Sequence, residues 1–140
     1  MKPLLVTQIS ALRKSVKKWE NIVAVLEDPD YFVVFEAGAK DCACCQEFLD
    51  DRGFGDCQGC PVAEAVRDTN CGKTPYEEWA AAFDDLEGVV GSRPGVRFET
   101  KKERQSLLKP AKKELQFLRG ILRDKEKEAK TLSTELLKIL

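Results

Sequence analysis

The feature that most constrains this chain is a cysteine-rich stretch in its middle. All six cysteines lie between positions 42 and 71, and most of them form two Cys-x-x-Cys pairs, Cys42 with Cys45 and Cys57 with Cys60. Eleven residues separate the pairs, and Cys71 follows after ten more. Because two such pairs can surround one tetrahedral ion from opposite sides, the spacing predicts a metal site, and four thiolates suit zinc best.

The ligand set contains one open choice. We expect four of five cysteines to bind the ion, with the two pairs as the first choice and Cys71 as the alternative ligand: Cys42, Cys45, Cys57, Cys60 and Cys71. Cys44 is then a packing residue. An iron–sulfur cluster is an alternative, since Cys-x-x-Cys-Pro also occurs in ferredoxin-type ligation. Disulfides are a third alternative, although nothing else in the sequence indicates secretion.

The residues around the second pair predict a knuckle that leads into a helix. Gly59 allows the tight turn that points both sulfur atoms inward. Pro61 is a favourable first helical residue, and an apolar run follows it. Cys60 is therefore expected at a helix N-terminus, where the helix dipole favours its thiolate form.

Three short motifs follow one another along this stretch: Cys42-Ala43-Cys44-Cys45, Cys57-Gln58-Gly59-Cys60-Pro61-Val62 and Cys71-Gly72-Lys73-Thr74-Pro75-Tyr76. Together they resemble a group of small, largely uncharacterised zinc-binding proteins common in phage and prophage genomes. The resemblance covers at most residues 15 to 85, and the doublet Cys44-Cys45 departs from a plain Cys-x-Leu-Cys. It implies a metal-stapled module from a mobile element and implies no enzymatic activity.

Residues 4 to 27 predict an amphipathic helix, because their apolar residues recur at alternating steps of four and three: Leu5, Ile9, Leu12, Val16, Trp19, Val23 and Leu26. Asp28-Pro29-Asp30 ends this helix, since proline disfavours the helical conformation in the residue before it. Residues 31 to 35 are rich in β-forming side chains and predict either a short strand or an apolar loop packed on the metal module.

A second helix is predicted to start at Thr74 and Pro75. Thr74 is a good N-cap, Pro75 suits the first helical position, and Glu77 completes a capping box. One face of this helix is apolar and is expected to belong to the core: Tyr76, Trp79, Ala80, Phe83 and Leu86. Glycines and a proline then predict a turn or hinge at residues 88 to 97.

The C-terminal part, from about residue 100 to 140, predicts one long helix. Its apolar seam extends over more than four heptads, with Lys125 as the only polar member: Leu108, Ala111, Leu115, Leu118, Leu122, Lys125, Ala129, Leu132, Leu136 and Ile139. Pro110 predicts either a kink or the effective start of the helix.

Residues 4 to 27 carry a matching seam, so we expect them to pair antiparallel with part of residues 108–140. The C-terminal helix is the longer of the two, which leaves apolar seam for a second copy of the chain or for a host protein. The expected contacts with this partner are Leu118, Leu122, Leu132 and Leu136.

Charge is segregated along the chain, although the net charge is only −1. Residues 1–26 hold five basic and one acidic residue (+4), residues 27–100 hold six and seventeen (−11), and residues 101–140 hold twelve and six (+6). The simplest interpretation is a solvated surface in which basic helices pack beside an acidic head. Alternatively, the acidic middle is suited to occupy a basic, nucleic-acid-binding surface of a host protein. The basic helices are suited to phosphate backbones, but their acids and bases alternate as i,i+4 pairs, which makes nucleic acid the weaker hypothesis.

The composition argues against an enzyme. The chain has no histidine and no glycine-rich phosphate loop, and zinc held by four cysteines has no open position for water. We expect no signal peptide, because the apolar run at residues 3 to 6 is short and is followed at once by polar residues. We also expect no membrane span. A cytoplasmic location is predicted, in the host cell if the protein is encoded by a phage.

These observations predict a mainly α fold in three parts. A small treble-clef-like or knuckle-type four-cysteine zinc module (residues 29–97) is inserted between an N-terminal amphipathic helix (1–28) and a C-terminal coiled-coil-like helix (98–140). The expected function is a non-enzymatic, phage-type protein-interaction module, for which anti-CRISPR-like inhibition of a host defence or nucleic-acid-processing protein is one concrete form. A nucleic-acid-binding zinc protein and an iron–sulfur redox or sensor protein are the alternatives.

Overall fold

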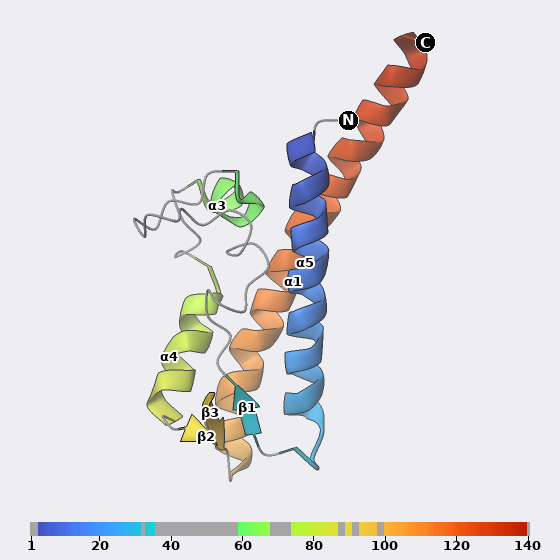
Figure 1. Ribbon diagram of the computed structural model, residues 1–140. Helices are drawn as coiled ribbons and strands as arrows, with labels where there is room; N and C mark the ends of the chain where they lie inside the picture. Colours follow the sequence, from blue (N-terminus) through green and yellow to red (C-terminus); the bar gives the residue numbers. More distant parts are fainter. Residues whose placement is uncertain are drawn as a thin grey trace.

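The computed structural model describes residues 3–31, 33–35, 59–67, 74–86, 89–90, 93–97 and 100–139. Within them the elements are, in chain order, α1 (Pro3–Glu27), β1 (Val33–Phe35), α3 (Pro61–Val66), α4 (Tyr76–Leu86), β2 (Val89–Val90), β3 (Arg93–Arg97) and α5 (Lys101–Ile139) (Figure 1). The chain is mainly helical, which confirms the predicted class. Of the predicted zinc module (29–97), the segments 36–58 and 68–73 lie outside the described residues, and with them the first cysteine pair, Cys57 and Cys71.

The two long helices α1 and α5 lie antiparallel and form the axis of the molecule (Figure 1). The predicted pairing of residues 4–27 with part of 108–140 is therefore confirmed. The predicted apolar stripes supply most of the buried apolar residues of this hairpin: Leu5, Ile9, Leu12, Val16, Trp19, Val23 and Leu26 from α1, and Leu108, Ala111, Leu115, Leu118 and Ala129 from α5. Leu107 and Ile121 of α5 are also buried, although the predicted seam does not contain them. Removal of these two apolar stripes from water stabilises the hairpin.

Ion pairs between α1 and α5 show the register in which the two helices pair. Three of them join the helices: Arg13–Glu126 at 2.8 Å, Glu20–Arg119 at 3.4 Å and Glu27–Lys112 at 3.8 Å. Seven residues forward along α1 correspond each time to seven residues back along α5, as expected for an antiparallel pair with a heptad seam. Because these side chains are about half exposed, the pairs contribute more to register than to stability.

The start of α5 is set by a capping box. The Glu103 N–H donates to the Thr100 hydroxyl and the Thr100 N–H donates to the Glu103 carboxylate, both at 3.1 Å. The helix therefore begins at Lys101 and continues through Pro110, which lies inside it. The prediction that Pro110 marks the effective start of the helix is wrong, because the helix already starts at the Thr100 cap, ten residues earlier.

The C-terminal end of α1 is held by Arg104, in the first turn of α5. Its guanidinium donates to three backbone carbonyls, those of Leu26 (2.9 Å), Asp28 (2.8 Å) and Tyr31 (2.6 Å). The last carbonyls of a helix have no partner within the helix. Arg104 supplies that partner and fixes the direction in which the chain leaves α1 toward β1.

Replacing this guanidinium should therefore destabilise the fold. We expect Arg104→Met to lower the free energy of unfolding by about 2–3 kcal/mol, the range for lost hydrogen bonds to a charged group. Arg119 lies on the same helix as Arg104, and Arg119→Met removes only its exposed ion pair with Glu20 of α1. This variant should lower the free energy of unfolding by less than about 1 kcal/mol. Urea denaturation measures both; equal losses would contradict the role assigned to Arg104.

α4 packs against the hairpin through aromatic rings. Trp79 meets Trp19 edge to face, with ring centroids 5.3 Å apart, and Phe83 lies 6.1 Å from Trp79. The Tyr76 ring also meets Trp19 edge to face, with ring centroids 6.3 Å apart. Trp79 is 1% exposed and Phe83 is also buried, so the prediction that this aromatic face belongs to the core is confirmed.

A small antiparallel sheet lies beside α4 and the start of α5 (Figure 1), with the strand order β1-β3-β2. β1 pairs with β3 in the register Val33↔Arg97, and β2 pairs with β3 in the register Val90↔Arg93. Of the two predictions for residues 31 to 35, the strand is therefore correct. The prediction that residues 88 to 97 are only a turn or hinge is wrong. Pro94 and Gly95 made a strand improbable there, but β3 forms because β1, far away in sequence, pairs with it.

Candidate metal centre

Cys60 is the one predicted metal ligand among the described residues. The other four, Cys42, Cys45, Cys57 and Cys71, lie outside them, so the structure does not show whether the five come together. Within the described ranges, no group of three or more histidine, cysteine, aspartate or glutamate side chains is arranged to hold a metal ion. What the structure shows is the local environment of Cys60.

The backbone at Cys60 has the predicted knuckle-to-helix form. Gly59 has φ 80°, a left-handed conformation that glycine adopts at little cost, and it makes the turn between the two cysteines of the second pair. Cys60 is the N-cap of α3 with an extended backbone, and Pro61 follows at the first helical turn. The predicted turn at Gly59 and the predicted helix start after Cys60 are confirmed, while the partner cysteine of the pair, Cys57, lies outside the described residues.

The thiol side of this element faces the interior. Cys60 is 2% exposed and shares one core cluster with Val62 and Ala63 of α3 and with residues of α1, α4 and α5. The three predicted segments of the chain therefore contribute to a single core. A buried sulfur next to a tight glycine turn suits a thiolate ligand of zinc, so the residue that is described fits a structural metal centre.

Polar contacts fix α3 to both long helices. The Gln8 side-chain amide donates to the Gly59 carbonyl at 2.8 Å and to a Glu64 carboxylate oxygen at 3.0 Å. The other oxygen of Glu64 accepts from the Lys125 ammonium group at 2.9 Å. We call Gln8, Glu64 and Lys125 the knuckle clamp, because one member belongs to each of α1, α3 and α5.

The knuckle clamp explains Lys125, the one polar member of the predicted C-terminal seam, whose side chain is only 18% exposed. Gln8 and Glu64 were not among the predicted site residues. Gln8 is 3% exposed, and the sequence sign of its role was a polar residue next to the apolar stripe of a heptad helix. Its partner could not have been inferred, because 51 residues separate it from Gly59.

The predicted partner contacts have different environments. Leu118 is 3% exposed and lies in the core, so within this fold it is not available to a partner. Leu122 and Leu132 are partly buried against Leu5, Ile9 and Ala129. Leu136 is 49% exposed. Of the four, Leu136 alone is largely accessible, because α1 already covers the earlier part of the seam.

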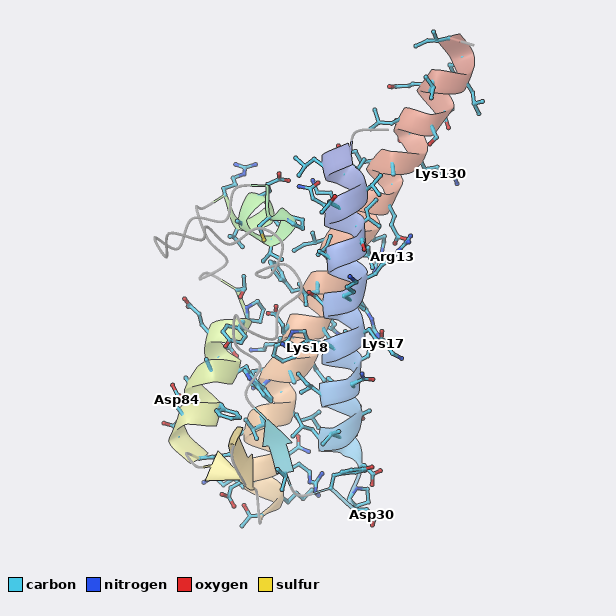
Figure 2. The ribbon with its side chains drawn as sticks, in the orientation of Figure 1. Arg13, Lys17, Lys18, Asp30, Asp84 and Lys130 are labelled. Carbon is cyan, nitrogen blue, oxygen red and sulfur yellow. The ribbon has the colours of Figure 1, made fainter. Side chains whose placement is uncertain are left out.

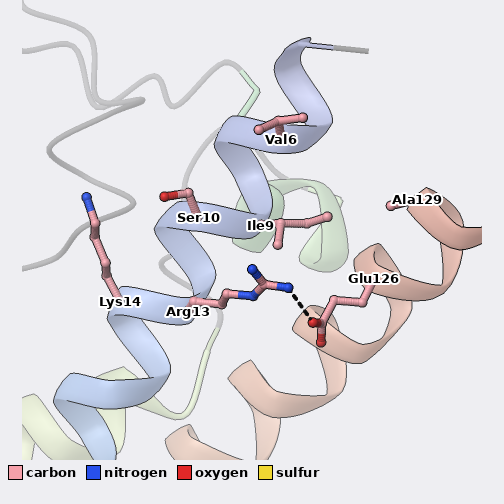
Figure 3. Close-up of a pocket in the computed structure, with 7 residues that line it drawn as sticks. All are labelled: Val6, Ile9, Ser10, Arg13, Lys14, Glu126 and Ala129. Carbon is pink, nitrogen blue, oxygen red and sulfur yellow. Dashed lines mark hydrogen bonds and ion pairs between the residues drawn. The ribbon is translucent and has the colours of Figure 1, made fainter. Parts of the chain in front are cut away.

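An open groove of about 640 Å³ lies between the N-terminal half of α1 and the facing part of α5 (Figure 3). Its apolar lining comes from Val6, Ile9 and Ala129. Arg13 and Glu126 form an ion pair across it, and Lys14 also lines it, with its side chain directed away from α5 (Figure 3). Of the other cationic side chains, Lys17 lies near the middle of α1 and Lys130 lies toward the C-terminal end of α5 (Figure 2).

Comparison with protein families, with curated proteins and with solved structures finds no match to this chain. In the part of the chain that the structure describes, none of the helices has the length and apolar character needed to cross a membrane.

Proposed function

We propose that this chain is a non-enzymatic protein-interaction module stapled by a structural zinc ion. The observation that carries the proposal is the apolar end of the helical hairpin. Five of the six large apolar side chains that are exposed within the described residues belong to the first turn of α1 or the last turns of α5: Leu4, Val6, Leu136, Leu137 and Ile139. We call these five residues the apolar tip.

The apolar tip lies at the end of the hairpin where α1 begins and α5 ends (Figure 1). α5 extends past the N-terminal end of α1 there, and Leu137 and Ile139 are 72% and 81% exposed. Large apolar side chains that are exposed together at one end of a molecule are typical of a protein-interaction site. A second copy of the chain or a protein of the host is the proposed partner, and the resemblance to phage proteins supports a host defence or nucleic-acid-processing protein.

Nucleic acid is the weaker proposal, and it would involve the basic side chains along the helices and not the apolar tip. Five basic groups of the helical hairpin form ion pairs with acidic groups of the same chain, which lowers their availability for phosphates: Arg13, Lys112, Lys113, Arg119 and Lys125. A gel-shift assay at low salt tests this alternative directly.

The interaction proposal predicts the effect of charging the apolar tip. Leu136→Glu/Ile139→Glu should abolish self-association or the retention of a host protein, while leaving the melting temperature within a few degrees, because both side chains are exposed. Thr131→Glu/Thr134→Glu adds the same charge on exposed positions of the same helix and should leave binding intact. Light scattering of the pure protein and pull-down from a bacterial lysate measure the two forms of binding.

A wild-type protein that is monomeric and retains nothing would contradict the proposed function. Retention that is unchanged in the doubly charged tip variant would instead show that partners bind elsewhere.

The metal part of the proposal rests on the spacing of the five cysteines and on the knuckle geometry at Cys60. Elemental analysis of the purified protein should find one zinc ion per chain, as a four-cysteine site takes. Iron with visible absorption that bleaches on reduction would support the iron–sulfur alternative. Removal of zinc by a strong chelator should lower the melting temperature, and an unchanged melting curve would exclude a structural metal.

A further inference from the structure

Two hollows follow one another between α1 and α5 on one face of the helical hairpin. The first is the groove of about 640 Å³ that contains the Arg13–Glu126 pair (Figure 3). The second has about 370 Å³, and its lining includes the pairs Glu20–Arg119 and Glu27–Lys112. The three ion pairs follow each other at steps of seven residues on both helices, so the two hollows lie on the same face of the hairpin. We call the two hollows together the outer groove.

The rims of the outer groove between these ion pairs also follow the heptad. Ser10 lines the first hollow, and Ala24 and Gln116 line the second. Lys17 lies seven residues from both Ser10 and Ala24, and Arg123 lies seven residues after Gln116, so both take equivalent rim positions. All five side chains are exposed. Within the described part of the chain, no element therefore covers these rims.

The outer groove has an excess of positive charge. Each acidic residue that lines it, Glu20, Glu27 and Glu126, is paired with a cation of the opposite helix. Four further cations on or beside its rims are exposed and have no ion-pair partner among the described residues: Lys14, Lys17, Arg123 and Lys130. The pairs within the hairpin therefore use up the carboxylates and leave the cations in excess.

The floor of the outer groove is apolar. Ile9 and Ala129 form it in the first hollow, and Val23 and Leu115 form it in the second. A groove between two helices, with an apolar floor and charged rims, suits an amphipathic helix that lays its apolar face on the floor. A flat membrane surface does not fit a concave groove, and a phosphate backbone has no apolar face to offer the floor. The charge excess selects a helix whose polar face is acidic.

We propose that the outer groove binds an acidic amphipathic helix of a partner protein, whose carboxylates pair with Lys17, Arg123 and Lys130. The inference rests on the proposed interaction function and names the chemistry of the partner. The groove extends beside residues 6–27 of α1, which is about 30 Å at about 1.5 Å per residue. A helix of roughly 20 residues has this length.

Two matched peptides test the proposal on the purified full-length protein. One is a labelled helical peptide of roughly 20 residues with leucine and alanine on one face and glutamate on the other. Its twin has lysine in place of glutamate. Fluorescence anisotropy should show that the acidic peptide binds at least about 10-fold more tightly than the basic twin. Its affinity should fall between about 0.1 M and about 1 M salt, because the Debye length shortens from about 10 Å to about 3 Å.

Variants of the protein locate the binding site. Lys17→Glu/Arg123→Glu reverses one cation on each rim and should weaken binding of the acidic peptide by about 10-fold or more, because like charges then face each other. Lys101→Glu/Lys102→Glu makes the same change of charge at exposed positions in the first turn of α5, outside the groove, and should leave binding unchanged. Ser10→Trp fills the first hollow without changing the charge and should also weaken binding.

Equal binding of the two peptides would refute the proposal, and so would unchanged binding of the acidic peptide by both groove variants. Tighter binding of a DNA duplex than of the acidic peptide would also refute it, in favour of nucleic acid. Leu136→Glu/Ile139→Glu should still bind the acidic peptide, because both side chains lie outside the groove lining. The assay therefore separates the groove from the apolar tip: if the groove is refuted while the tip variant loses its partner, the proposed function stands.

Discussion

Cys60→Ala is expected to lose its bound zinc. The variant removes one proposed ligand, and three thiolates without a fourth partner no longer close a structural site. Loss of the ion removes the stabilisation that it gives to the folded state, about 4 kcal/mol when free zinc exceeds its dissociation constant 1,000-fold. Elemental analysis and urea denaturation with and without zinc measure the two effects.

The helical hairpin should survive this loss. Its core is formed by side chains of α1, α4 and α5 that need no metal, so the helical signal in circular dichroism should remain near that of the wild type. Cys44→Ala is the matched control, because it removes a thiol of the same stretch that the spacing does not assign to the metal. Retention of zinc by Cys60→Ala would assign the four ligands to the other candidate cysteines.

Trp79→Ala should have the largest effect on the folded core. Trp79 is 1% exposed, and its ring packs against Trp19 of α1 and against Phe83 on its own helix. Truncation of a large buried aromatic side chain costs about 3–5 kcal/mol, because its transfer from water and its packing are both lost. We expect a loss of that size in the free energy of unfolding, measured by urea denaturation followed by far-UV circular dichroism.

Asp84→Ala provides the control for this variant. Asp84 is exposed on the same helix and points away from the hairpin (Figure 2). Its replacement should change the free energy of unfolding by less than about 0.5 kcal/mol. A loss below about 1 kcal/mol in Trp79→Ala would mean that α4 contributes little to the core.

The helices were predictable because their signals are local or periodic. Thr100 and Glu103, three positions apart, carry the information that starts α5. Apolar residues recur at alternating intervals of three and four residues in α1 and α5, and this pattern predicted both helices. It also predicted their antiparallel pairing, because two apolar stripes in one chain can bury each other. The turn at Gly59 and the helix start after Cys60 followed from residue types at adjacent positions.

The sheet and the knuckle clamp were not predictable in this way. β3 contains Pro94 and Gly95, which locally indicate a turn, and it becomes a strand because β1 lies beside it. Lys125 was an exception on an apolar seam, and its reason is a carboxylate 61 residues away on another element. Nor could the sequence show that α1 would cover Leu118 and leave Leu136 exposed.

The sequence by itself determined where the long helices begin and end, which of their faces are apolar, and where thiol groups are dense enough to suggest a metal. These properties depend on backbone propensity and side-chain period, which neighbouring residues specify. Only the tertiary structure decided that α3 is held between α1 and α5, that three short strands form a sheet, and that the apolar surface left over gathers at one end. Each of these depends on contacts between residues far apart in the chain, and no local pattern encodes such contacts.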